Sequence, residues 1–383
     1  MDDLGYASHY QPLDRIIGLT SAIRVLWGTL EREQVASAYL LKGPEGVGKT
    51  TLAVAYAQAS ACLNPRRNPY RACEECESCR RVASGTQPEI VLIQPAGDQT
   101  QIWQLWDRDR RGPGVLEHSL NYTPAIGRKR VYIFERAETL TPAAANSMLK
   151  VLEEAPPYAV FLLLTATVDR ILPTILSRCQ VLAALPPAQQ EFERWLREVH
   201  GVPDAQVAVI AALSDGLPGA AVRFVRNPGA IEEIEGIVRA GIELTGCRPL
   251  SALRAAEQLR NLAAGLKALK AESAPTEEPE SGEAPPARTR TSRRDMATVL
   301  RVLLTVYRDM LLLRLDPEGC NVSLRQHITE LRTCASSRTP AQWREVLDML
   351  TLALRRLEQN VSPQLVTDWI TTAIALSGNA SGR

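Results

Sequence analysis

The sequence predicts an α/β domain, built on a parallel sheet with helices on both faces, followed by a purely helical remainder. Two observations lead to this prediction. Short apolar runs alternate with helical stretches through the first 185 residues, and the strand signals stop at Pro186. Such alternation is typical of parallel strands that are buried between helices.

Four apolar runs are expected to form the strands of this sheet. Each run indicates a buried strand, because polar or turn-forming residues bound it on both sides. The runs are SAYLLKG (37–43), PEIVLIQP (88–95), KRVYIFE (129–135) and AVFLLLTA (159–166).

The helical remainder is expected to contain two further domains. Residues 188–226 indicate a small helical unit, interrupted by HGVPD and DGLPG, and the chain after about residue 229 is rich in Leu and Ala. Residues 271–294 are dense in Pro, Glu, Ser and Arg and predict a disordered linker. Helices resume at Asp295 and continue to about Leu376. The predicted domains are 1–185, 186–228 and 229–383.

The length of the chain and its charge composition restrict the partners and the location that we expect. A chain of 383 residues is long for one domain. Because 44 basic side chains nearly balance 43 acidic ones, no global field attracts nucleic acid or membranes. The N-terminus is acidic and polar, unlike a signal peptide, and no long uncharged apolar run follows. We therefore expect a cytoplasmic protein.

A phosphate-binding loop follows the first expected strand. SAYLLKGPEGVGKTTLAVAYAQ contains the spacing G-x-x-x-x-G-K-[ST] between a strand and a helix. In such a loop the backbone N–H groups hold phosphates, Lys49 reaches the β and γ oxygens, and the Thr50 hydroxyl binds Mg²⁺. The residues expected to bind ATP are Gly43, Gly46, Gly48, Lys49, Thr50 and Thr51. The alternatives are a chance match and a degenerate loop, but no loop residue is altered.

A cluster of cysteines follows that helix. CLNPRRNPYRACEECESC places Cys62, Cys73, Cys76 and Cys79 at a spacing that can close a tetrahedral Zn²⁺ shell. Disulfides are the alternative, which a cytosolic location disfavours. We expect this module, 62–79, to bind structural zinc. Four other cysteines stand alone and are expected to be small buried side chains: Cys179, Cys247, Cys320 and Cys334.

These motifs, with the segment LTPAAANSMLKVLEEAPPYAVFLLLTATVDRILPTILSRCQ, resemble the ATPase core of bacterial DNA polymerase III clamp-loader subunits. The resemblance spans about residues 10–225. It implies an AAA+ domain (1–185), a helical lid (186–228) and a C-terminal collar (229–383). It also implies a ring of five subunits, which opens the sliding clamp and sets it on primer-template DNA.

Two members of this family compete, the delta-prime subunit and the gamma/tau motor. At the end of the strand that corresponds to 129–135, the motors carry the pattern D-E-A-[DE]. This chain has Glu135, Arg136, Ala137 and Glu138 there. A guanidinium cannot accept the proton of the attacking water. The motor's sensor-2 arginine would fall near Gly219. Both departures predict ATP binding with little or no turnover, although Glu135 could still reach Mg²⁺ and Glu138 could act as a displaced base.

Other site residues are implied by the same resemblance. Arg178 in SRC matches the arginine that enters a neighbouring subunit's ATP site, where it stabilises transition-state charge. Its alternative role is a surface arginine at a helix end. Ile16 and Ile17 either line the adenine pocket or belong to the core, and Thr165 matches sensor 1 or simply ends a strand. The Trp and Arg residues of 102–115 stay unassigned.

The sequence thus predicts a delta-prime-like subunit of the DNA polymerase III holoenzyme, a DNA-directed DNA polymerase assembly. ATP, Mg²⁺ and Zn²⁺ are the expected cofactors. The expected partners are gamma/tau and delta subunits, the sliding clamp and, through the complex, DNA. The alternatives are an active gamma/tau-type motor ATPase and a non-enzymatic AAA+ scaffold with vestigial nucleotide binding.

Overall fold

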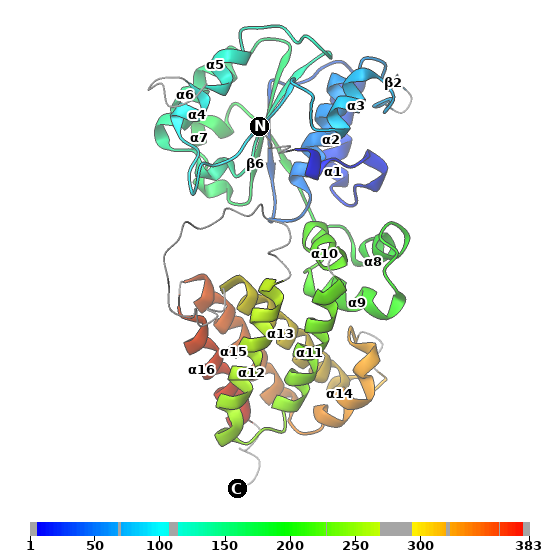
Figure 1. Ribbon diagram of the computed structural model, residues 1–383, viewed down its shortest axis with the longest axis vertical. Helices are drawn as coiled ribbons and strands as arrows, with labels where there is room; N and C mark the ends of the chain where they lie inside the picture. The colour runs from blue at the N-terminus through cyan, green and yellow to red at the C-terminus, as the bar shows by residue number, and fades with distance from the viewer. Residues whose placement is uncertain are drawn as a thin grey trace, which may run out of the picture. The chain divides into compact units, whose positions relative to one another are not determined.

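The chain folds into two compact units, drawn in Figure 1. This computed structural model describes residues 6–67, 70–106, 114–226, 228–268, 293–318, 322–359 and 361–377. One unit comprises Met1–Trp195 with Leu217–Gly219, and the other comprises Leu196–Gly216 with Ala220–Arg383. None of the described helices is both long enough and apolar enough to cross a membrane.

The first unit contains a five-stranded parallel sheet in the order β4-β5-β6-β1-β7. Its strands are β1 (Ala38–Lys42), β4 (Ile90–Ile93), β5 (Arg130–Phe134), β6 (Ala159–Thr165) and β7 (Gln180–Ala183). The four strands expected from the sequence are confirmed. Strand β7 was not foreseen, because it lies at an edge of the sheet and only Leu182 within it is buried.

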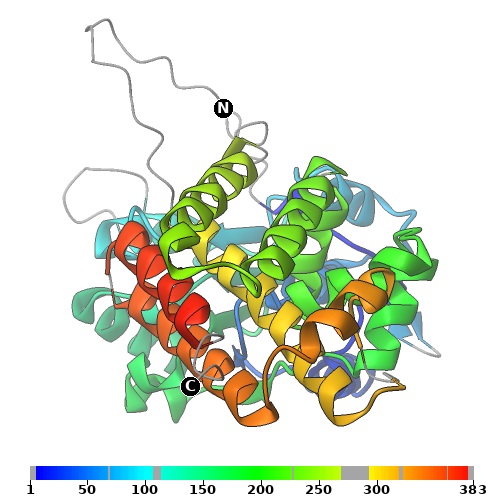
Figure 2. The same ribbon diagram turned by 90° about the horizontal axis from the view of Figure 1, so that it is seen from below.

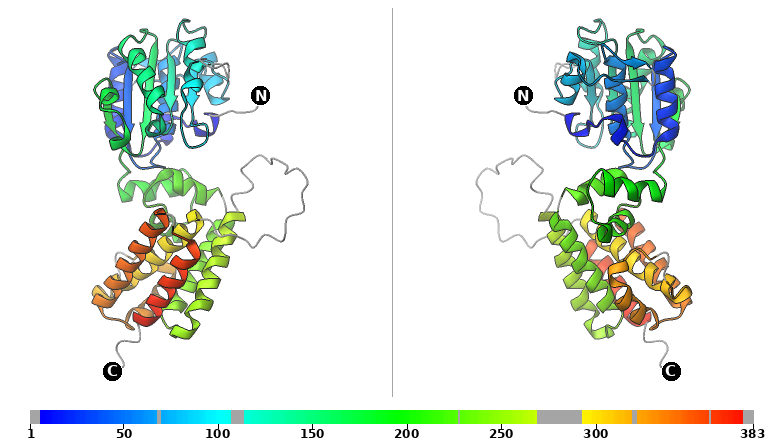
Figure 3. Two further views of the ribbon diagram at one scale, coloured as in Figure 1. Left: turned by 90° about the vertical axis from the view of Figure 1, so that its left-hand side faces the viewer. Right: turned by 90° about the vertical axis from the view of Figure 1, so that its right-hand side faces the viewer.

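Helices cover both faces of the sheet, as predicted (Figure 3). The side chains of each strand alternate between the faces, so Leu41 packs with one group of helices and Leu40 with the other. The first group contains α1 (Thr20–Glu31) and α2 (Lys49–Ala61), and the second contains α4 (Ile102–Leu105), α5 (Val115–Ser119), α6 (Pro142–Glu153) and α7 (Pro173–Leu176). The predicted α/β layering is therefore confirmed.

The order of the strands sets the position of the candidate site. Strand β6 lies between β1 and β5, and all three are parallel. Because parallel strands end at one edge of a sheet, the loop after β1, the acidic residue after β5 and Thr165 on β6 lie side by side.

A buried ion pair lies at the opposite edge of the sheet. Arg130 begins β5 and Glu89 precedes β4, and their side chains are 9% and 1% exposed. The Arg130 Nε donates to Glu89 Oε2 at 2.6 Å, and its Nη1 donates to the Tyr122 carbonyl at 2.7 Å. The Ala125 N–H donates to Glu89 Oε1 at 2.7 Å. These hydrogen bonds offset the cost of burying two charges.

The second unit is helical, with one long helix at its centre. This helix, α13 (Arg293–Leu315), packs against α11 (Pro228–Leu244), α12 (Ala252–Ala268), α14 (Ile328–Ala335) and α15 (Pro340–Glu358), and Figure 2 shows it among them. Tyr307 on α13 stacks on Trp343 of α15 at 5.7 Å between ring centroids. The last helix, α16 (Pro363–Ser377), ends within one residue of the predicted limit.

Three shorter helices precede this bundle in the chain, as the breaks HGVPD and DGLPG predicted. They are α8 (Gln189–Glu198), α9 (Asp204–Leu213) and α10 (Pro218–Val225). Helix α13 begins at Arg293, so the last two residues of the predicted linker, 293 and 294, are helical instead. The rest of that predicted linker, up to residue 292, lies outside the described residues.

Replacing Glu89 with alanine tests the buried pair. Arg130 would then be buried without its carboxylate, so we expect the free energy of unfolding of the first unit to fall by about 3 kcal/mol or more. Denaturant titration of the full chain measures this change. The matched control Glu77→Gln removes an exposed pair with Arg81 and should cost less than about 1 kcal/mol. Similarly small losses of unfolding free energy in both variants would contradict the stabilising role of the buried Glu89–Arg130 pair.

Candidate nucleotide site and cysteine cluster

The phosphate-binding loop joins β1 to α2 and is held closely against its neighbours. The Gly43 N–H donates to the Thr165 carbonyl at 3.1 Å. A Cβ atom at Gly43 would lie 2.1 Å from the Ala184 carbonyl oxygen, so only glycine fits. Gly46 and Gly48 have φ of +83° and +103°, which glycine adopts without strain. The loop therefore needs glycine for space at one position and for backbone conformation at two.

Lys49 begins α2 and folds back over the loop. Its Nζ donates to the Gly43 carbonyl at 2.7 Å and to the Pro44 carbonyl at 2.9 Å. Burial lowers the pKa of Lys49, and the charges of Glu138, Glu45 and Glu135 oppose that effect. The Lys49 ammonium thus donates to two neutral carbonyls. A phosphate group is charged and is therefore a stronger acceptor, so it would replace them.

Glu135 follows β5 and connects three parts of the first unit. Its Oε1 accepts a hydrogen bond from Thr50 Oγ1 at 2.6 Å, and its Oε2 accepts one from Gln94 Nε2 at 3.0 Å. His9 Nε2 lies 3.9 Å from Glu135 Oε1. The sequence paired Thr50 with Glu135 through Mg²⁺, but nothing in it indicated His9 or Gln94. Those contacts depend on where the N-terminal segment and β4 lie in the fold.

Arg136 is exposed and has an unusual backbone. Its φ of +50° lies in the left-handed region, which is uncommon for residues other than glycine. Two residues later, in the 3₁₀ turn Ala137–Thr139, Glu138 has a buried Oε2 that accepts no hydrogen bond among the described residues. After β5 the chain therefore offers the guanidinium of Arg136, while the nearby carboxylate oxygen of Glu138 has no described donor.

Gly219 lies directly on the phosphate loop. Its N–H donates to the Gly46 carbonyl at 2.8 Å, and a Cβ atom there would lie 3.0 Å from that oxygen. Gly219 therefore has no side chain near the phosphate loop, and even a Cβ atom would be in tight contact with Gly46.

The remaining residues predicted for nucleotide binding are buried or partly buried. Thr165 is fully buried, and its Oγ1 accepts the Thr167 N–H at 3.1 Å. Ile17 is buried, and Ile16 packs against the core cluster between the sheet and α1 and α2. Thr51 lies in the first turn of α2, immediately after Thr50. This packing favours the alternative that Ile16 and Ile17 belong to the hydrophobic core.

These residues fit a magnesium nucleotide. The loop presents backbone N–H groups at the start of α2, with Lys49 beside it, and this arrangement suits phosphates. Thr50 and Glu135 bring a hydroxyl and a carboxylate together, the oxygen ligands that Mg²⁺ prefers. When bound, the metal would neutralise phosphate charge, and the chain's own groups would orient the phosphates.

Arg178 follows α7 and is partly exposed. Its Nε donates to Glu153 Oε1 at 2.8 Å, and its Nη1 donates to the Thr174 carbonyl at 2.8 Å. The side chain is 31% exposed, so the guanidinium is neither buried nor free of its own chain.

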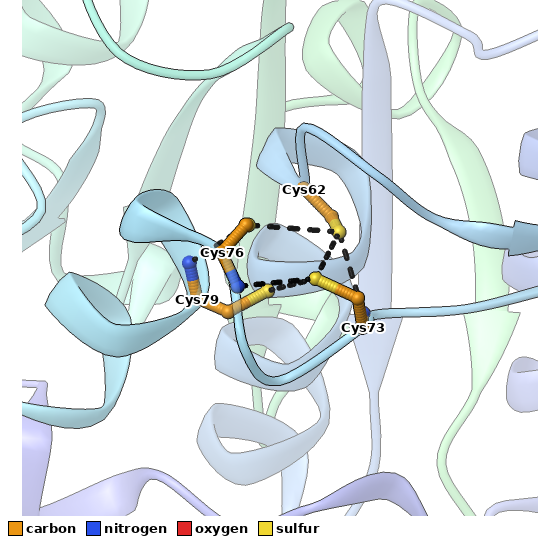
Figure 4. A group of neighbouring side chains, drawn as sticks. All are labelled: Cys62, Cys73, Cys76 and Cys79. Carbon is orange, nitrogen blue, oxygen red and sulfur yellow. Dashed lines mark hydrogen bonds between the residues drawn. The ribbon is translucent and has the colours of Figure 1, made fainter.

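The four predicted zinc ligands come together beside α2, as Figure 4 shows. All four Sγ atoms lie within 4.8 Å of one another, with Cys62 Sγ 3.5 Å from Cys73 Sγ and Cys73 Sγ 3.9 Å from Cys79 Sγ. The hairpin β2 (Arg66–Arg67) and β3 (Tyr70–Arg71) and helix α3 (Glu77–Ala83) supply the surrounding backbone. Backbone N–H groups donate to sulfur, for example Cys76 N–H to Cys73 Sγ at 3.3 Å.

This donor set fits Zn²⁺. Tetrahedral coordination at about 2.3 Å places sulfurs about 3.8 Å apart, close to the separations observed. A hydrogen bond with Cys79 lowers the pKa of Cys62 to about 5 and raises that of Cys79, so one thiol already tends toward the thiolate that binds metal. With four protein ligands the site would be closed and structural.

The other predictions from the sequence have mixed outcomes. Cys179, Cys247 and Cys334 are free and partly buried rather than fully buried, and Cys320 lies outside the described residues. Burial raises the pKa of Cys179 to about 11, which makes this thiol unreactive. In the stretch 102–115, residues 107–113 also lie outside the described residues.

Replacing Cys73 with serine tests the zinc module. We expect bound zinc to fall from about one ion per chain to none, because three thiolates leave the shell open. Metal analysis of the purified chain by mass spectrometry measures this, and Cys179→Ser is the control that should keep its zinc. Full zinc content in the Cys73 variant would exclude the four-cysteine site.

Comparisons with known proteins agree with this geometry. Residues 18–188 match the family described as DNA polymerase III, delta subunit. The DNA polymerase III subunit delta' of Pseudomonas aeruginosa is 35% identical over 234 residues, or 60% of this chain and 69% of that protein. The subunit delta' of Bacillus subtilis is 33% identical over 176 residues, or 46% of this chain and 50% of that protein.

Other matches carry the gamma/tau name. The DNA polymerase III subunit gamma/tau of Mycoplasma genitalium is 32% identical over 45% of this chain and 27% of that protein. A crystal structure of a DNA polymerase III gamma subunit-related protein from Thermotoga maritima covers 92% of this chain and all of that chain, at 18% identity and a TM-score of 0.48. From the extent and identity of the delta' matches, this chain belongs to the AAA+ clamp-loader subunits of DNA polymerase III.

Proposed function

We propose that this chain is a delta-prime-like clamp-loader subunit that binds ATP, hydrolyses it weakly or not at all, and supplies Arg178 to a neighbouring ATPase subunit. The observation that carries the proposal is Arg136 at the general-base position after β5. A guanidinium accepts no proton at cellular pH, so the usual activation of water is missing. The absence of a side chain at Gly219 supports the same conclusion.

Nucleotide binding is supported by the intact loop. Gly46 and Gly48 adopt positive φ, as a loop that wraps around phosphate requires, and Thr50 and Glu135 would supply Mg²⁺ ligands. In this proposal the bound ATP serves as a structural element whose presence affects assembly.

The finger role is supported by the position of Arg178. It follows α7 and its side chain is 31% exposed, so part of the guanidinium is accessible from outside the chain. An arginine supplied from another subunit stabilises the negative charge of the transition state and makes hydrolysis depend on assembly.

The partners follow from the family. The curated relatives are matched over part of their length, half for Bacillus subtilis and 69% for Pseudomonas aeruginosa, so the activity of the whole protein belongs to the proposal. We propose gamma/tau and delta subunits, the sliding clamp and primed DNA as partners. Residues 186–228 would be the lid and 229–383 the collar. Zinc would fix the 62–79 module.

The second candidate is an active motor of the gamma/tau type. One observation favours it, which is the buried Oε2 of Glu138 without a described donor, on a residue whose charge acts on Lys49. That oxygen could accept a proton from water if the nucleotide brought one close.

Nucleotide binding and turnover by the purified chain separate these candidates. We expect ATP to bind, and Lys49→Ala to weaken binding by about tenfold to a hundredfold, because a charged hydrogen bond to phosphate is lost. Titration calorimetry measures the affinity. Steady-state phosphate release should stay near background. Motor-like turnover that Glu138→Gln abolishes would instead establish the second candidate, and no ATP binding would favour a scaffold.

Reconstitution with the motor and delta subunits tests the finger. We expect Arg178→Ala to slow hydrolysis at the neighbouring site by about three orders of magnitude, as for other fingers supplied in trans. Steady-state phosphate release by the complex measures how much of the total hydrolysis rate is lost with the neighbouring site. The control is Arg170→Ala, an exposed arginine in the turn before α7. Equal rates for the two variants would remove the finger from the proposal.

A further inference from the structure

The guanidinium of Arg178 is already occupied within its own chain. Its Nε donates to Glu153 Oε1 at 2.8 Å, and its Nη2 contacts the same oxygen. Its Nη1 donates to the Thr174 carbonyl at 2.8 Å and to Ser177 Oγ at 3.3 Å. Each of its three nitrogens therefore has a partner, and Glu153 is the charged one among the residues that the structure describes.

This pairing competes with phosphate binding. A guanidinium recognises a phosphate through two parallel N–H groups, and here the edge formed by Nε and Nη2 points at a carboxylate. If Glu153 stayed in place, its negative charge would also repel a phosphate brought to the same guanidinium. The two anions therefore compete for the same edge of the Arg178 guanidinium.

The pairing is also easy to break. The side chain of Glu153 is 52% exposed and that of Arg178 is 31% exposed, so water screens their attraction. Glu153 is the last residue of α6, where the negative end of the helix disfavours a carboxylate. An exposed pair of this kind shifts an equilibrium by up to about fivefold.

We propose that Glu153 is a positioning residue that holds Arg178 against α7 in the unassembled subunit and releases it when a neighbour's phosphate takes its place. This inference rests on the proposed function for its consequence, but the contact itself is a property of the isolated chain. Without the carboxylate, the binding-competent arginine is populated more often, and the apparent affinity for the partner site rises in proportion.

The first experiment uses the isolated chain. Phenylglyoxal modifies accessible arginines, and peptide mass spectrometry gives the rate at Arg178. We expect Glu153→Gln to raise that rate by about two- to fivefold, the factor that an exposed pair supplies. Glu154→Gln, the exposed carboxylate next in the chain, is the matched control and should leave the rate unchanged. Equal rates for wild type and Glu153→Gln would overturn the proposal.

The second experiment titrates the chain into the motor and delta subunits and follows ATP hydrolysis. We expect Glu153→Gln to lower the half-maximal concentration by about two- to fivefold at an unchanged plateau, and this difference should shrink at high salt. In an Arg178→Ala background the Glu153 substitution should have no effect. A higher half-maximal concentration or a lower plateau would show that Glu153 assists the finger, and would overturn the proposal.

The two experiments distinguish failure of this inference from failure of the proposed function. If Arg178→Ala leaves hydrolysis by the complex unchanged, the finger role is wrong, whereas the labelling rates still decide whether Glu153 holds Arg178. If Arg178→Ala slows hydrolysis but Glu153→Gln changes neither the labelling nor the titration, only the inference drawn here is wrong.

Discussion

The close approach of Gly43 to its neighbours is the constraint on which the first unit's site depends. The chain leaves β1 between β6 and β7, donates from the Gly43 N–H to the Thr165 carbonyl, and passes so near Ala184 that a methyl group would overlap its oxygen. This fixes the entry of the loop into α2. The N–H groups at the start of that helix, Lys49 and Thr50 all take their positions from it, because a rigid sheet edge orients the residues that follow.

The charges around this loop have separate roles. Lys49 lies under the influence of three carboxylates, of which Glu135 also accepts a hydrogen bond from Thr50. Arg136 lies among these acidic residues in sequence but is exposed, with a left-handed backbone. We propose that Lys49, Thr50 and Glu135 hold phosphate and metal, and that Arg136 stands in place of the usual group that activates water. Under our proposal the catalytic charge of this chain acts at a neighbour's nucleotide through Arg178.

The cysteine cluster fastens a segment that the sheet does not hold. The described residues of the 62–79 segment contain only two short paired strands, β2 and β3, and the start of helix α3, which bury little apolar surface. Four sulfurs within 4.8 Å, with backbone N–H groups directed at them, give this segment a defined conformation beside α2. A structural metal commonly supplies the folding free energy that such a small core cannot.

The local features could be predicted from the amino-acid sequence: four strands, the phosphate loop, the breaks between helices and the spacing of the four cysteines. Each depends on residues close in the chain, where periodicity, glycine placement and ligand spacing act directly. The contacts between residues far apart in the chain became visible in the folded structure. It placed β7 at the sheet edge, Gly219 on Gly46, His9 and Gln94 beside Glu135, and Glu153 on Arg178. The physical reason is that a hydrogen bond or ion pair between distant residues needs the packed sheet and helices to bring its partners together. No local pattern records which ones will meet.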